Sequence, residues 1–213
     1  QHAEEYRNKP SVGAYLRMIR YAGVWASVFL LPLWFLLASN PEMLPEKFSY
    51  ISINDPGHIP LIVQFIFIEI GIDLLRMAAI HTPTSLATAL GLIAALMIGQ
   101  VAVEVGLLTN EVILYFSVAT IGTFATPSYE MGLANRLARL FLLLSTAFFH
   151  SYGFVVGTLL LILYLVNMKA FGIPYLWPFI PFNPKALKEV LLRSPIPNKN
   201  RRPSVLHPKD PDR

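Results

Sequence analysis

The chain has 213 residues, of which 54% are hydrophobic and only 14% are charged, and its mean hydropathy is +0.53. Soluble domains carry about 25% charged residues, so this composition excludes an ordinary soluble domain. It favours an all-α, polytopic membrane domain with about five to six membrane segments. The chain contains no cysteine, which excludes disulfides and thiol chemistry within it. It begins at Gln1 without a signal-peptide pattern, so we expect a part of a longer protein.

Apolar runs of near-membrane length define the expected segments. Residues 1–20 form a lead-in, which is either an amphipathic helix on the membrane surface or a solvated helix. The predicted membrane segments are residues 21–38, 59–80, 86–108, 111–126, 137–149 and 153–168. Pro32 should kink the first of them. The segment 111–126 is short, and the pair within 137–168 either forms a short hairpin or is re-entrant.

The C-terminal part has a different composition. Residues 169–193 are rich in aromatics and proline, which indicates an interfacial segment followed by a short amphipathic helix. Residues 194–213 form a basic, proline-rich tail that we expect to be cytoplasmic and extended or disordered. Attraction to anionic lipid headgroups is the plainest role for this tail, and we expect no nucleic-acid partner.

The distribution of basic residues predicts the orientation. With six segments, every lysine and arginine except Lys47 lies on or near the side of the two termini. The positive-inside rule then places both termini in the cytoplasm. A single span over residues 140–165 would move the basic tail to the other side, so the charge pattern favours a break near residues 150–153.

Charged and amide side chains interrupt two of the apolar runs. Glu69, Asp73 and Arg76 share one helical face by their spacing, and Gln100 and Glu104 repeat the four-residue step on the next segment. One interpretation makes Glu69, Asp73, Gln100 and Glu104 pore or inter-subunit contacts. The other is an Asp73–Arg76 ion pair, with Arg76 and Glu104 reaching water at the membrane surfaces.

The chain shows none of the sequence patterns of common enzymes or metal sites. There is no glycine-rich phosphate loop, no nucleophile elbow, no HExxH motif and no histidine pair at metal-ligand spacing. We therefore expect no cofactor, no metal and no enzymatic activity.

Three stretches carry a resemblance to a known family. They are IDLLRMAAIHTP, GLIAALMIGQVAVEVGLLTNEVI and ATIGTFATPSYEMGLANRLARL, and they include an acidic-Leu-Leu-Arg motif at residues 73–76, a Gly-Gln-x-Ala-Val motif at 99–103 and a Pro-x-Tyr turn at 127–129. The chain resembles the A subunits of GerA-type spore germinant receptors. The resemblance implies an additional N-terminal soluble domain, residence in the spore inner membrane and homo-oligomers that form an ion channel. It also implies partnership with other germination subunits or a small membrane protein.

Three functions remain open. The first is a membrane subunit of a spore germination complex that conducts monovalent cations. The second is a component of dipicolinate transport, which the carboxylates in the spans disfavour because a path for a dianion should present cations. The third is a scaffold without a pore, in which every buried charge is matched within one chain.

Overall fold

The computed structural model of the chain describes residues 9–53, 57–81, 84–170 and 172–191. The predicted tail 194–213 and the first eight residues of the predicted lead-in lie outside these ranges. The regular secondary structure of the described residues is helical, which confirms the all-α prediction, except for a two-stranded antiparallel pair, β1 (Lys169–Ala170) and β2 (Ile173–Pro174).

The predicted lead-in and first membrane segment form one long helix. It comprises α2 (Pro10–Trp25), the π-helical stretch η1 (Ala26–Leu30) and α3 (Leu31–Ser39). Proline suits the first turn of a helix, and Pro10 opens α2. Pro32 has no N–H to donate to the preceding turn, and the π-helical stretch lies directly before it. The Asn40 amide ends the helix by donating to the carbonyl of Leu36 at 2.9 Å.

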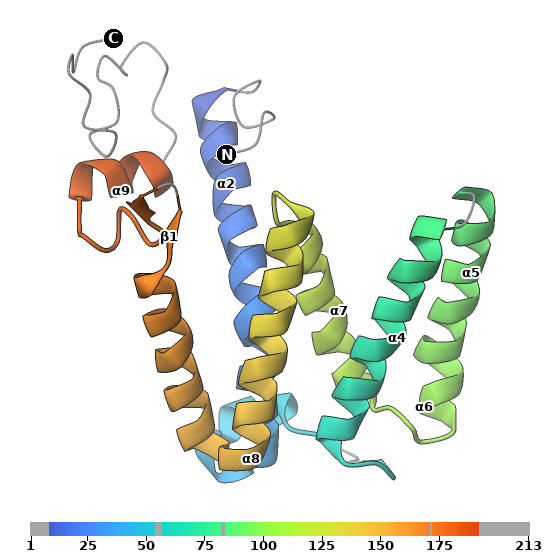
Figure 1. Cartoon of the computed structure of the whole chain (residues 1–213). Helices are drawn as coiled ribbons and strands as arrows, with labels where there is room; N and C mark the ends of the chain where they lie inside the picture. Colours follow the sequence, from blue (N-terminus) through green and yellow to red (C-terminus); the bar gives the residue numbers. More distant parts are fainter. Residues whose placement is uncertain (1–8, 54–56, 82–83, 171, 192–213) are drawn as a thin grey trace.

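A helical hairpin follows two short 3₁₀ turns, η2 (Pro41–Met43) and η3 (Glu46–Ile51). The hairpin consists of α4 (Leu61–His81), α5 (Thr84–Leu96), the π-helical η4 (Met97–Val101) and α6 (Ala102–Glu104). It stands at one side of the molecule, with α5 outermost (Figure 1).

The next two helices begin with side-chain caps. Thr109 caps α7 (Asn110–Phe124), and Ser128 caps α8 (Tyr129–Asn167) by accepting from the Met131 N–H at 3.2 Å. His150 has a φ of 51° and interrupts α8, so residues 129–149 and 151–167 are separate halves that run in opposite directions (Figure 1). The break predicted near residues 150–153 is confirmed.

The described ends of the chain meet at one end of the molecule. The C-terminal helix α9 (Pro184–Leu191) packs against α2, where Arg17 Nη1 and the Tyr21 hydroxyl donate to the Val190 carbonyl at 3.0 and 2.9 Å. Between these ends, α2–α3, α4, α5, α7 and the two halves of α8 alternate in direction (Figure 1).

Two of the described helical stretches are long and apolar enough to cross a membrane by length and composition, namely Pro10–Ser39 and Tyr129–Asn167, and Thr88–Glu104 is a shorter apolar helix. The second stretch is α8, which the break at His150 divides into two halves. The count of five to six membrane segments therefore remains a prediction. Helix α4 carries Glu69, Asp73 and Arg76, so composition alone does not mark it as a membrane helix.

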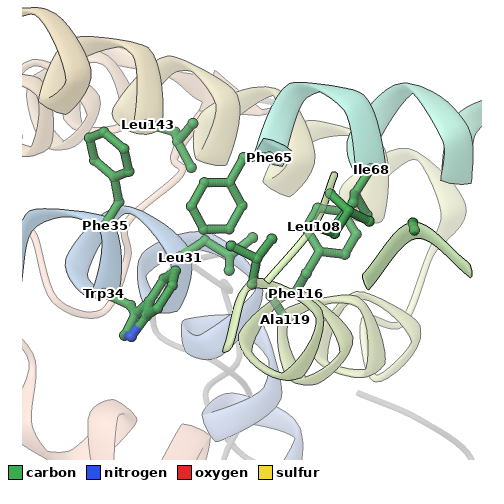
Figure 2. Packing of buried hydrophobic residues seen from close by; sticks show 11 residues of the cluster. Leu31, Trp34, Phe35, Phe65, Ile68, Leu108, Phe116, Ala119 and Leu143 are labelled. Carbon is green, nitrogen blue, oxygen red and sulfur yellow. The ribbon is translucent and has the colours of Figure 1, made fainter. Parts of the chain in front are cut away.

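The apolar core joins residues of α3, α4, α6, α7 and α8. Leu31, Trp34 and Phe35 pack against Phe65 and Ile68 of α4 and against α7 (Figure 2). The Trp34 ring stacks on Tyr115 with centroids 4.6 Å apart and meets Phe65 edge-on at 5.7 Å. This core fixes the position of α4 along its own axis, and Glu69 follows directly after the buried Ile68 of α4.

Candidate functional site

Glu69 is the centre of a buried ion-pair cluster between α4 and the first half of α8. Only 4% of Glu69 is exposed. Arg139 Nη2 lies 2.7 Å from each of its carboxylate oxygens, and Arg136 Nε donates to Oε1 at 3.2 Å. Both arginines are also buried. Charge-assisted, two-oxygen contacts of this kind are among the strongest hydrogen bonds in proteins.

Arg139 also ties the cluster to the first helix. Its Nη1 donates to the carbonyl of Ser27 at 3.1 Å, and Ser27 lies in the π-helical stretch before Pro32. The guanidinium lies over the Phe116 ring, 5.4 Å from its centroid. Irregular π-helical turns often accompany functional sites, and here one supplies a backbone acceptor to a buried cation.

Asp73 extends the cluster toward the end of α4. It forms an ion pair with Arg136, and its side chain is 47% exposed. The structure thus gives Asp73 a partner on α8 instead of the Arg76 predicted from spacing. Arg76 lies over two aromatic rings, 5.7 Å from the centroid of Phe124 and 5.8 Å from that of Tyr129. Interactions of cations with aromatic faces give Arg76 a favourable alternative to the carboxylate.

We define the Glu69 cluster as Glu69, Asp73, Arg136 and Arg139. Its two carboxylates and two guanidiniums sum to zero formal charge, which is the condition for keeping ionised groups out of water. The remaining two residues of the predicted site lie elsewhere. Gln100 in η4 and Glu104 in α6 are both exposed and belong to the outer part of the hairpin.

Arg136 and Arg139 are not predicted as partners of Glu69 from the sequence, where they count only among the basic residues on or near the side of the two termini. One signal was present: the two arginines are three residues apart at the start of an apolar run, so they share a helical face. Within the described residues, no group of three or more His, Asp or Glu side chains is placed to hold a metal ion.

Comparison with known proteins identifies the family. The model of the Bacillus/Clostridium GerA spore germination protein family matches residues 1–205. The chain belongs to the GerA family. It is 54% identical to stage V sporulation protein AF of Bacillus subtilis over 210 residues. The matched region covers 99% of this chain and 43% of that protein. The resemblance drawn from its motifs is confirmed.

More distant relatives match over the same extent. Spore germination protein A1 of Bacillus subtilis is 28% identical over 99% of this chain and 44% of its own length. Spore germination protein KA of the same organism is 26% identical over 99% of this chain and 39% of its own length. The chain therefore spans less than half the length of these relatives. No solved structure matches it.

Proposed function

We propose that this chain is the membrane domain of a subunit of a spore germination complex, and that several copies surround a channel for monovalent cations. The relatives named as germination and sporulation proteins support a role in spore germination. Two long apolar helical stretches support a location in a membrane. The proposed location is the spore inner membrane with both chain ends in the cytoplasm, and no enzymatic activity is assigned.

The exposed carboxylate of Glu104 is the observation on which the channel proposal rests. It is exposed on an apolar helix, between the exposed Val101 and Val105, and it has no ion pair within the described residues. A carboxylate in such a position needs water or a partner chain. Gln100 is exposed one helical turn away. A ring of these side chains from several copies would attract cations and repel anions.

Glu69 contributes less to this proposal than the sequence suggested. Its carboxylate is neutralised by Arg136 and Arg139 of the same chain. A carboxylate held by two guanidiniums presents little charge to a passing ion. The proposed polar lining therefore centres on Glu104 and Gln100, and Glu69 and Asp73 take a structural role.

Ion flux tests the proposal. The full-length protein, with any partner subunit, is reconstituted in liposomes, and K⁺ and dipicolinate fluxes are measured for the unchanged protein and for Glu104→Gln. We expect K⁺ flux that falls in the variant, together with a weaker preference for cations over anions. Glu42→Gln is the matched control, because Glu42 is also exposed but lies in η2, outside the hairpin; its flux should stay unchanged.

A scaffold is the second candidate, favoured by the Glu69 cluster. The buried charges of this cluster are matched within one chain, as a subunit without a pore would require. Absence of both fluxes despite confirmed oligomers would support the scaffold. Dipicolinate flux without K⁺ flux would overturn the cation channel in favour of dipicolinate transport.

A further inference from the structure

The α4–α6 hairpin joins the rest of the fold at one corner. Gly57 precedes it and Gly106 follows it, with φ of +69° and +72°. Residues other than glycine rarely adopt such left-handed angles. The His58 N–H donates to the Gly106 carbonyl at 3.3 Å, so the two glycines are neighbours. A Cβ atom on Gly106 would lie 3.3 Å from the His58 ring. We call residues 58–81 and 84–105 the arm.

The base of the arm is pinned close to this corner. The Gln64 side chain is 1% exposed. Its amide nitrogen donates to the Ile59 carbonyl at 2.9 Å, and its oxygen accepts from the Thr109 N–H at 3.0 Å. Phe65 enters the apolar core one residue later. Rotation about the corner is therefore easier than separation of the base from the fold.

Beyond the base, the arm rests on α7 across incompletely filled space. A cavity of about 260 Å³ lies between α4, η4 and α7, with Ile72, Ile98 and Ile113 in its wall. The Thr120 hydroxyl, also in that wall, is buried without a hydrogen-bond partner. A second cavity of about 320 Å³ lies beside Arg76. Both are grooves that open to the surface. The apolar packing of the arm against α7 is therefore concentrated near the base, where Phe65, Ile68 and Ala102 enter the core, and is incomplete beyond it.

The polar contacts described above hold the outer part of α4 instead. Glu69 and Asp73 pair with Arg136 and Arg139 of α8, and Arg76 lies over aromatic rings of α7 and α8. We propose that the arm is a hinged element that pivots at Gly57 and Gly106, and that the Glu69 cluster is the latch that holds it against the bundle. This pivoting does not depend on whether the protein conducts ions.

Spin-label distances test the latch. This chain contributes no cysteine, so once any cysteine elsewhere in the full-length protein is replaced by serine, an introduced pair of cysteines reports on chosen positions. Leu92→Cys on α5 and Leu137→Cys on α8 are exposed sites, at 65% and 61%. The distance between the two spin labels is measured in full-length protein that is diluted with unlabelled protein in lipid nanodiscs. Glu69→Gln should broaden the distribution of this distance and add longer distances. Glu104→Gln makes the same chemical change on the arm, away from the latch, and should leave it unchanged.

A reference pair separates arm movement from general loosening. Tyr15→Cys and Leu137→Cys, both on exposed positions outside the arm, should keep their distance distribution in the Glu69→Gln variant. Broadening of the reference pair to the same extent would overturn the proposal, because the whole bundle would then have loosened. An unchanged arm distance in Glu69→Gln would overturn it as well.

The pivot is tested by restricting one glycine. Asparagine tolerates left-handed angles but has a narrower range than glycine, so Gly106→Asn keeps the observed backbone and reduces its freedom. In the Glu69→Gln background, this change should narrow the broadened arm distances. Gly91→Asn, at an open position on the arm, is the control and should not. An arm distance distribution that is equally broad with and without Gly106→Asn would place the pivot elsewhere and overturn the hinge.

Discussion

Arg139 is the residue on which the buried charge balance most depends. Replacing Arg139 by alanine leaves Glu69 with Arg136 as its remaining cation and removes the bond to the Ser27 carbonyl. Removing one member of a buried ion pair typically costs about 3–5 kcal/mol, and we expect a loss of this order in unfolding free energy. Arg139→Lys keeps the charge but not the planar fork, so its loss should be smaller. Thermal unfolding in detergent, followed by circular dichroism, measures both.

A charge-balanced double variant is the control for this prediction. Glu69→Gln combined with Arg139→Met removes one charge of each sign and leaves the Asp73–Arg136 pair in place. Removing both charges of a buried pair leaves no uncompensated charge, which is the main cost of removing only one partner, so the double variant should be more stable than Arg139→Ala. A double variant as unstable as the single one would show that the lost contacts of Arg139, and not an uncompensated charge, set the cost.

The sequence identified Glu69 as a carboxylate in need of a partner but could not name the partner. Arg136 and Arg139 are 67 and 70 residues away along the chain, and their pairing depends on how α8 lies beside α4. Local spacing suggested Arg76 for Asp73, because residues three apart on a helix are neighbours. Aromatic rings from other helices compete for Arg76, and spacing along one helix contains no information about them.

Helices α2 and α7 approach each other closely at a pair of glycines, Gly23 and Gly122. A Cβ atom on Gly122 would collide with the Gly23 carbonyl, so Gly122→Ala must push the helices apart. Overpacking of this kind costs about 1–3 kcal/mol, and we expect a matching fall in unfolding free energy. Gly91→Ala is the control, since no atom lies within 4 Å of its added Cβ. Equal stabilities of the two variants in the same thermal assay would contradict the close approach.

The turn within α8 stores backbone strain at His150. Its φ of 51° and ψ of −131° lie in a region that glycine adopts readily and other residues avoid. His150→Gly should therefore raise the unfolding free energy, by about 1 kcal/mol. His150→Val should lower it, because a β-branched side chain tolerates this conformation least. Chemical unfolding of both variants measures the difference, and a stability order of Val above Gly would contradict the strain.

At the level of helices, the apolar runs predicted which segments form helices better than they predicted where each helix begins and ends or what it contacts. The run after residue 86 was recognisable, but not the π-helical stretch Met97–Val101 within it. Gly91, Ala95 and Gly99 are four residues apart in that run, and small residues at this spacing predict close helix packing in a membrane. Instead, Gly91 and Gly99 face open space, and the close contact is at Gly23 and Gly122. Spacing shows which residues share a face, whereas tertiary packing decides which face is covered.

Across the whole molecule, the alternation of helices and the placement of charge support the same orientation. The start of α2, the α7–α8 turn and α9 lie at one end, and η2 and the break in α8 lie at the other (Figure 1). Arg17 and Lys188 belong to elements that lie at the first end. Lys47, in η3, belongs to the second. This matches the distribution that the positive-inside rule favours for cytoplasmic chain ends.

Cysteine labelling tests this orientation. Single cysteines replace Glu42 in η2, Ser128 before α8 and Lys188 in α9, all at exposed positions. This chain has no cysteine of its own, and any cysteine elsewhere in the full-length protein is first replaced by serine. In intact cells that express the full-length protein, a membrane-impermeant maleimide should label position 42. Positions 128 and 188 should react only after permeabilisation, because basic residues near them are retained on the cytoplasmic side. Labelling of positions 42 and 188 from the same side would require an even number of crossings between them. The alternating helices provide an odd number, α4, α5, α7 and the two halves of α8, so that result would contradict the arrangement in which each of these segments crosses the membrane.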